Sequence, residues 1–280
     1  MIRVEKPVLD TKTIIEDCIS NVIKQPTLSH IKASKMTIVS KSRDYDELAE
    51  KSQLSTLIRH SSVPGGATKE DMVWLYDNKF VADRGRKYYE KIKLLPKWGK
   101  CPFCGVGIVS TLDHYLPKTE YPTYAVTPYN LVASCSDCNK KKTTTIITTR
   151  AEELIHPYYD DFDDEIWLKS KAIYKDEMVF WFFVEKPEAW NQEKYERAKN
   201  HFKKLGLNSL YVAHCGEEFA EYECTAKTLY EIGGEKLVKK DLVERIKERR
   251  RIIKNNWRAA MYEGLLCSED FFECYLECIK

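Results

Sequence analysis

The sequence has almost no net charge and lacks long hydrophobic runs, internal repeats and low-complexity segments. Its 280 residues include 45 Lys and Arg against 43 Asp and Glu, so the formal charge is only +2. Any basic surface for nucleic acid therefore has to be local. No run approaches the roughly 20 apolar residues that a membrane span needs. The opening MIRVEKPVLDTK also lacks the apolar core of a secretory signal, so we expect a cytoplasmic protein without a membrane segment.

Cysteine, in contrast, occurs at two places with the spacing of metal ligands. Cys101 and Cys104 form one Cys-x-x-Cys turn, and Cys135 and Cys138 form a second. Each turn directs two sulfurs at one point, so the two turns can close a tetrahedral site with no open position, which is typical of structural Zn²⁺. Four free thiols or two disulfides are the alternatives. Disulfides are disfavoured in a chain that has no secretory signal.

The other cysteines mostly fall at apolar positions of helical patterns, which favours buried thiols. A second metal site is the alternative, because Cys274 and Cys278 stand four residues apart and His214 precedes Cys215. The six cysteines in this group are Cys18, Cys215, Cys224, Cys267, Cys274 and Cys278.

Between the two cysteine turns lies a pair of residues that can carry chemistry. Asp113 and His114 combine a hard oxygen ligand with a base that titrates near neutral pH. Asn139 follows the last cysteine directly and offers a second oxygen ligand, held in place by its neighbour Cys138. An isolated Asp-His pair is usually an ordinary surface feature. Between the two cysteine turns, the same pair indicates a candidate catalytic site.

The order of these residues resembles that of the HNH endonucleases, the ββα-metal nucleases that carry a zinc ribbon. All matching pieces lie within residues 101–142, and chance assembly of so many parts is improbable. The third letter of HNH falls on Asn139, which keeps an oxygen ligand for the metal. The pieces are Cys101-Pro-Phe-Cys104, Leu112-Asp113-His114, Asn130-Leu131-Val132, Cys135-Ser-Asp-Cys138-Asn139 and Lys142.

The resemblance implies a role for each matching residue. Asp113 and Asn139 would hold one catalytic Mg²⁺ or Mn²⁺, which stabilises charge on the scissile phosphate and the leaving oxygen. His114 would be the general base that activates the attacking water. Asn130 would hydrogen-bond across the ββα loop and support the backbone that presents His114.

Four lysines beside the motif are candidates for contact with phosphate, although a solvated face is an equally good interpretation of them. They are Lys118, Lys140, Lys141 and Lys142.

The activity implied by the resemblance is metal-dependent hydrolysis of DNA phosphodiester bonds. RNA, for example tRNA, is an alternative substrate, because a metal-activated water does not need a 2′-OH. A non-catalytic zinc-ribbon module that binds nucleic acid or protein is a third interpretation, but such a module would need only the four cysteines. Proteins with this arrangement include effectors of bacterial anti-phage systems that are partnered with an ATPase.

The expected fold class is α+β, with a ββα-metal zinc-ribbon core between two larger regions. The division we expect is an N-terminal helical region over 1–96, the core over 97–150, and a C-terminal region over 151–280 with a β-hairpin followed by helices. The flanking regions are larger than a minimal HNH unit needs. We expect them to hold a partner protein, a second copy of the chain or the path of the substrate.

Hydrophobic periodicity and turn residues predict the elements of these regions. Residues 27–42 remain ambiguous between a loop and a basic arm, and 143–149 between a loop and a short strand. The predicted helices are 9–24, 45–58, one opened by the cap Thr68, 83–94, one beginning near Asp137, 191–205, 210–230, 235–266 and 269–279. The predicted strands are 108–113, 130–134, 166–174 and 178–184, the last of them expected in the core.

Three further features have more than one interpretation. His156 follows the motif closely, but a structural histidine is favoured over a second active-site imidazole. The acidic run over 160–165 indicates a solvated loop or a shield of the basic site. The basic stretch over 245–258 is consistent with phosphate contact or with a solvated helix face that carries ion pairs.

Overall fold

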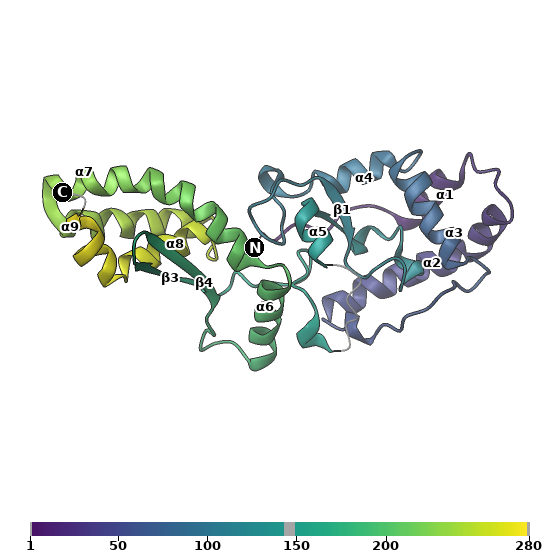
Figure 1. The fold of residues 1–280 in the computed structure, drawn as a ribbon. Coiled ribbons are helices and arrows are strands. Elements are labelled where there is room, and N and C mark those ends of the chain that lie inside the picture. Colours follow the sequence, from purple (N-terminus) through teal and green to yellow (C-terminus); the bar gives the residue numbers. More distant parts are fainter. Residues whose placement is uncertain (1, 143–148, 279–280) are drawn as a thin grey trace. The chain divides into compact units, whose positions relative to one another are not determined.

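The computed structural model describes residues 2–142 and 149–278, without the side chain of Cys278. The chain divides into two compact units, Ile2–Asp160 and Asp161–Lys280, which we call the N-terminal and the C-terminal unit (Figure 1). Helices and small antiparallel sheets build both, so the predicted α+β class is confirmed. The expected boundary after residue 96 lies within the N-terminal unit. The predicted three-part division of the chain stays a prediction.

The N-terminal unit places one small sheet among short helices. Its helices and strands are α1 (Thr11–Ile19), α2 (Thr27–Glu50), α3 (Lys69–Trp74), the π-helical turn η2 (Leu75–Val81), α4 (Arg86–Lys93), β1 (Thr111–His114), β2 (Leu131–Ser134) and α5 (Ser136–Lys142). Short 3₁₀ turns connect them: η1 (Leu54–Thr56), η3 (Lys97–Gly99), η4 (Pro122–Tyr124), η5 (Pro128–Asn130) and η6 (Arg150–Glu152).

Helix α2 corrects the predicted division of residues 27–58. It is one continuous helix, whereas the sequence predicted a loop or arm followed by a helix that began at residue 45. Small polar side chains explain the error, because Ser34 and Ser42 are buried together with the apolar residues of the helix. Oγ of Ser42 lies 2.7 Å from Oγ1 of Thr11, and Oγ of Ser34 accepts the backbone N–H of Ala67. Their polarity hides the helical period in the sequence.

The predicted cap of helix α3 at Thr68 is confirmed, and it is part of a capping box. The side chain of Thr68 accepts the backbone N–H of Asp71, and the carboxylate of Asp71 accepts the N–H of Thr68. After Trp74 the helix widens into η2, a π-helical turn, and such turns are frequent at functional sites. Helix α4 follows with Tyr88 and Tyr89 buried, which confirms a helix within the predicted range 83–94.

The segment from β1 to α5 has the ββα order. β1 pairs with β2 in antiparallel register, with Asp113 opposite Val132 and His114 opposite Leu131. β1 begins at Thr111, later than predicted, and Ile108 is exposed. α5 begins directly after β2 and Cys135. Residues 143–148, on which the prediction of a loop or short strand falls, lie outside the described part of the chain.

The C-terminal unit packs a β-hairpin on helices. Its elements are β3 (Leu168–Tyr174), β4 (Met178–Val184), α6 (Gln192–Lys204), α7 (Leu207–Ile252), α8 (Trp257–Leu266), the π-helical turn η7 (Asp270–Tyr275) and α9 (Leu276–Cys278). The hairpin agrees with the predicted strands, but only one face of β4 is buried. Phe180 and Phe182 are buried, whereas Trp181 is 60% exposed.

The long helices of the C-terminal unit differ from the prediction at their ends. The predicted break at Gly233 and Gly234 is confirmed, because both residues leave helical geometry at a kink that divides α7 into two helices. The second of these helices brings Arg245 over the ring of Tyr222. The predicted helix over 235–266 is wrong as a single element, because it ends at Ile252 and a new helix begins at Trp257. The side chain of Asn256 caps this new helix by accepting the N–H of Arg258. In the described part of the chain, no helix has the length and apolar character needed to cross a membrane.

Candidate metal centre and active-site cleft

The first cysteine turn is a tight loop built on glycine. The backbone N–H of Cys101 donates to the carbonyl of Gly107, and that of Gly105 donates to the carbonyl of Cys101. Gly105 has a positive φ of 72°, which favours glycine. A Cβ at Gly107 would lie 2.8 Å from Sγ of Cys135. The local sequence therefore makes room for the sulfur of the second turn.

The second cysteine turn is formed at the start of α5. Cys135 directly precedes the helix, and its Sγ accepts the backbone N–H of Cys138 at 3.5 Å. The carbonyl of Cys135 accepts the N–H of Asn139. Because the first turn of a helix holds these two residues, the position of Asn139 is fixed relative to both cysteines.

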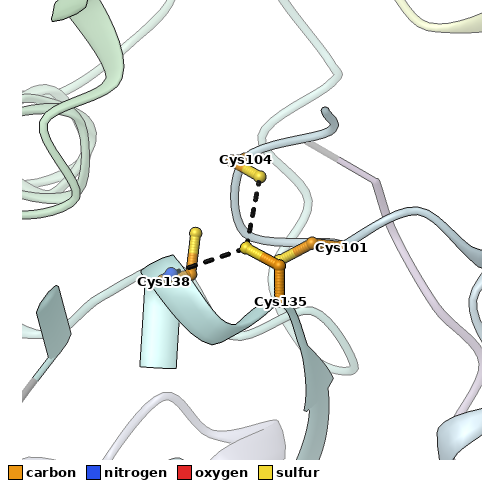
Figure 2. Close-up of side chains that lie close together, drawn as sticks. All are labelled: Cys101, Cys104, Cys135 and Cys138. Atoms are coloured by element: carbon orange, nitrogen blue, oxygen red, sulfur yellow. Dashed lines mark hydrogen bonds between the residues drawn. The ribbon is translucent and has the colours of Figure 1, made fainter. Parts of the chain in front are cut away.

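The two turns bring the four sulfurs together. Cys101, Cys104, Cys135 and Cys138 are all buried, and their sulfurs lie within 4.8 Å of one another, with Cys104 and Cys135 at 4.0 Å (Figure 2). In a tetrahedral zinc site with bonds near 2.3 Å, sulfurs are about 3.8 Å apart. The cluster could therefore hold a metal such as zinc. Among the described side chains it is the one group of three or more His, Cys, Asp and Glu residues with such geometry.

The four thiols of the cluster shift one another's pKa values in different directions. A hydrogen bond with Cys101 lowers the pKa of Cys104 to about 7. The pKa values of Cys101 and Cys135 are also lowered, by hydrogen bonds from neighbouring thiols that outweigh the opposing contacts. Hydrogen bonds with the other three thiols raise the pKa of Cys138 instead. All four have to become thiolates to bind a metal, so binding has to release the proton that the cluster holds at Cys138.

Asp113 lies next to a buried lysine. Its Oδ2 is 2.9 Å from Nζ of Lys142, and both side chains are less than a tenth exposed. The same ammonium group donates to the carbonyl of His114. Burial raises the pKa of Asp113, while the charge of Lys142 and a backbone hydrogen bond oppose that rise. Among the described residues, Oδ2 has no printed hydrogen bond besides this contact with Lys142, so the carboxylate could also offer a lone pair to a metal.

His114 is held as a neutral imidazole with a defined tautomer. Its Nε2 lies 2.8 Å from the carbonyl of Ala125. A carbonyl oxygen only accepts, so Nε2 carries the proton and Nδ1 keeps its lone pair. Burial lowers the pKa of His114 to about 3, and the charges of Lys118 and Lys142 add to that effect. The imidazole is therefore unprotonated, as a general base has to be.

Asn130 ties together the loop between β1 and β2. It is fully buried, and its Nδ2 donates to the carbonyls of Leu116 and Tyr124. Its Oδ1 accepts the backbone N–H of Leu116 at 2.7 Å and the hydroxyl of Tyr45 at 3.2 Å. One amide thus fixes the chain on both sides of the loop that directly follows His114.

A cleft of about 460 Å³ opens in the N-terminal unit and unites the candidate residues. Asp113 faces α5, where it meets Lys142, and His114 faces η2, where its ring lies 4.3 Å from that of Tyr76. Half-buried Asn139 also lines the cleft. The lining residues that were predicted from the sequence are Asp113, His114, Lys118, Asn139 and Lys142.

The four candidate lysines differ in their surroundings. Lys118 pairs with the carboxylate of Asp77, and Lys142 is buried against Asp113. Lys140 and Lys141 are exposed on α5. Contact with a nucleic acid stays a prediction for all four, and the last two are the more accessible.

Tyr76 and Asp77 also line the cleft, but neither was predicted as a site residue from the sequence. Both belong to η2, far from the cysteines in sequence, and neither stands in a recognisable motif. The only possible signal was the placement of this segment directly after a strong helix cap at Thr68.

His156 lies outside the cleft, in a cluster of tyrosines. Its ring centroid is 4.1 Å from that of Tyr115 and 4.7 Å from that of Tyr159. Its Nδ1 accepts the backbone N–H of Tyr158, and its Nε2 lies 3.4 Å from the hydroxyl of Tyr45. This geometry fits a structural histidine.

The C-terminal unit uses its charged side chains internally. The carboxylates of Asp163 accept the backbone N–H groups of Lys254 and Asn255, so part of the acidic run is structural. In the basic stretch, Arg245 pairs with Asp241, Arg250 with Glu263 and Arg258 with Glu218. Cys18 and Cys215 are buried thiols, and burial raises the pKa of both. The prediction of buried thiols is wrong for Cys224, Cys267 and Cys274, which are exposed. His214 lies beside Trp257 with tilted rings.

The fold and the cluster of cysteines define an α+β protein with a candidate metal centre in its N-terminal unit. Protein ea31 of Escherichia phage lambda is 32% identical to this chain over 259 residues, which cover 84% of this chain and 87% of that protein. The chain therefore belongs to the family of the phage lambda ea31 protein. Septu protein PtuB of Bacillus thuringiensis is 32% identical over 81 residues, 27% of this chain and 31% of that protein. No protein-family model and no solved structure matches the chain.

Proposed function

We propose that the protein is a metal-dependent endonuclease of the HNH type that hydrolyses phosphodiester bonds of DNA. The observation that supports this proposal is the cleft that Asp113, His114 and Asn139 line, the last of which directly follows Cys138 of the four-cysteine cluster. A structural module would need the cysteines alone. It would not need a neutral imidazole and a buried carboxylate on the wall of one cleft.

In this proposal Cys101, Cys104, Cys135 and Cys138 hold a structural Zn²⁺. The cluster connects the loop before β1 to the helix that carries Asn139, so it fixes the two sides of the cleft relative to each other. Folding and metal binding are then one equilibrium.

Asp113 and Asn139 would hold the catalytic Mg²⁺ or Mn²⁺, with carboxylate and amide oxygens of the kind that hard cations prefer. The bound metal supplies stabilisation of charge at the phosphate and the leaving oxygen. Nδ1 of His114 takes the proton of the attacking water, while the carbonyl of Ala125 holds the other nitrogen and stabilises the ring that becomes positively charged. Lys142 keeps Asp113 ionised in its buried position.

The charge of the two units supports a nucleic acid as the substrate of the N-terminal unit. Residues 1–160 contain 24 Lys and Arg against 19 Asp and Glu, whereas residues 161–280 contain 21 against 24. A local excess of positive charge raises the concentration of a polyanion near the cleft. Exposed Lys140 and Lys141 on α5 are the first candidates for contact with the phosphate backbone.

The setting we propose is bacterial anti-phage defence with a protein partner such as an ATPase. Two observations support this setting. The motif resembles that of such effectors, and part of the chain is similar to a Septu protein.

Cleavage assays test the activity and separate it from the alternatives. We expect the zinc-loaded protein with added Mg²⁺ or Mn²⁺ to cut supercoiled plasmid, linear duplex or single-stranded DNA. His114→Ala should lower the rate by about 10² to 10⁴, the usual size of general-base catalysis, with fold and zinc content unchanged. Cutting of total RNA alone would replace DNA by RNA as the substrate. Binding of DNA without cutting, with no effect of added metal, would favour the non-catalytic zinc-ribbon module.

A further inference from the structure

The imidazole of His114 touches an element that lies outside the motif. The π-helical turn η2 presents Tyr76 and Asp77 to the cleft. The ring of Tyr76 is buried and meets the imidazole at a centroid distance of 4.3 Å and an angle of 65°. On its own element, Tyr76 stacks on Phe80 at 5.5 Å and 18°. The ring of Tyr76 is therefore packed against Phe80 and also contacts the imidazole of His114.

Lys118, in the loop after β1, contacts both Tyr76 and Asp77. Its Nζ lies 4.4 Å from the centroid of the Tyr76 ring, within the range of a cation–π contact. The same ammonium group forms an ion pair with Asp77, the residue next to Tyr76. Both of its contacts are thus on η2, so it holds the loop and the π-helical turn together.

We infer that Tyr76, Asp77 and Lys118 form a positioning clamp for His114, and that Lys118 serves this clamp and is not a contact for substrate phosphate. The inference rests on the proposed function for its catalytic consequence. The hydrogen bond to the carbonyl of Ala125 fixes Nε2 of the imidazole. The ring can still rotate about the axis of this hydrogen bond. Edge-to-face contact with Tyr76 restricts this rotation.

The two roles of Lys118 predict opposite results for Asp77→Asn. If Lys118 bound phosphate, loss of its competing carboxylate would free it for the substrate. The KM would fall, and the dependence of KM on salt would become steeper. If Lys118 belongs to the clamp, loss of the carboxylate loosens the support of His114. The kcat then falls with KM and its salt dependence unchanged.

A matched control is present in the same unit. Lys35 and Glu16 form an ion pair at 2.7 Å with side-chain exposures of 26% and 45%, close to the 22% and 50% of Lys118 and Asp77. Neither residue lines the cleft. Glu16→Gln should therefore leave kcat and KM unchanged, which separates an effect of the clamp from general loss of an ion pair.

The deciding experiment combines these kinetics with a readout that needs no cleavage. Long-range ¹H–¹⁵N spectra of the intact zinc-loaded protein report the tautomer of His114, whose signals are assigned from their loss in His114→Ala. We expect a single tautomer protonated at Nε2 in the wild type and in Tyr76→Phe, and a mixture of tautomers in Tyr76→Leu. Where cleavage is measurable, Tyr76→Leu should lose about 10- to 100-fold in kcat by misplacing the base.

A single tautomer in Tyr76→Leu, or a lower KM in Asp77→Asn, would overturn the clamp. Absence of cleavage in the wild type would overturn the proposed function instead, and the spectra would still decide whether η2 holds the imidazole.

Discussion

Each unit contains a buried asparagine whose amide forms hydrogen bonds with backbone groups of separate segments. The two asparagines differ in the residues around them. Asn130 joins the two sides of the loop between β1 and β2 through both ends of its amide. In the C-terminal unit, Oδ1 of Asn255 accepts the backbone N–H groups of Trp167 and Leu168, and its Nδ2 donates to the carbonyls of Phe162 and Glu165. Their structural task is the same.

The residues around the two asparagines differ. Beside Asn130 a cleft holds a carboxylate, a neutral imidazole and the side chain of Asn139. Beside Asn255, in contrast, the charged groups serve the fold, since Asp163 caps the backbone and the arginines of α7 and α8 bind carboxylates. This difference is the reason why we place the proposed chemistry in the N-terminal unit.

The largest expected effect comes from the cysteines. Cys138→Ser should abolish stoichiometric zinc and unfold the N-terminal unit, because structural zinc contributes roughly 10–16 kcal/mol to the folding of small zinc domains. Exposed Cys224 of the C-terminal unit supplies the control, and Cys224→Ser should change neither property. Elemental analysis and hydrogen exchange measure both. One zinc per chain in Cys138→Ser, with normal protection of the N-terminal unit, would refute the structural site.

The two asparagines allow a direct comparison of the units. Asn130→Ala leaves the buried N–H of Leu116 without its acceptor, and Asn255→Ala does the same for Trp167 and Leu168. Each unsatisfied group costs about 1–3 kcal/mol, so both variants should be less stable by a similar amount. Hydrogen exchange should show the loss of protection in the mutated unit, and only Asn130→Ala should lose cleavage. Equal loss of cleavage in both would mean that the C-terminal unit also builds the site.

A moderate effect is expected from pH. Burial lowers the pKa of His114 to about 3, whereas the unfolded residue titrates near 6.5. Between these values the unfolded chain binds a proton that the folded chain does not, so stability falls as the pH drops below about 6.5. By pH 5.5 the loss should be about 1.4 kcal/mol.

The raised pKa of Asp113 contributes a change of stability with pH that has the opposite sign. The variant His114→Gln keeps Asp113, so its difference from the wild type isolates the contribution of His114. Denaturant unfolding of wild type and variant at pH 8 and pH 5.5 gives the comparison. The same pH dependence in both proteins would show that the imidazole is not held neutral.

The smallest effect is expected in the basic stretch of the C-terminal unit. Lys247 and Glu244 form an exposed ion pair at 2.8 Å on α7, and such pairs contribute about 0–1 kcal/mol. Lys247→Gln should change neither stability nor affinity for DNA, whereas Lys140→Gln in the N-terminal unit should weaken DNA binding and lower its salt dependence. Fluorescence anisotropy at several salt concentrations distinguishes them. The reverse pattern would place the nucleic-acid surface in the C-terminal unit.

The sequence predicted what depends on short-range order and missed what depends on packing. The cysteine turns, the helix cap at Thr68 and the β-hairpin follow from residues that are close in sequence, and the structure contains all of them. Asn130 was found because it stands in a motif. Asn255, with the same task, was missed because its partners lie about 90 residues away.

The errors have the same physical origin. The single helix α2 depends on the burial of serines, which a hydrophobic pattern does not detect. The end of α7 at Ile252 depends on Asp163, which binds the backbone of the turn that follows. Tyr76 reaches His114 only through the tertiary fold. No local pattern could have placed it there.

Chemical rescue tests the central claim most directly. His114→Gly removes the imidazole and leaves a space in the cleft, which added imidazole can enter. We predict that zinc-loaded His114→Gly fails to cut DNA in Mn²⁺ and that imidazole restores cutting in proportion to its concentration, while Asp113→Ala is not restored. Cutting by His114→Gly at the rate of the wild type, without imidazole, would contradict the assignment of His114 as the base and with it the proposed active site.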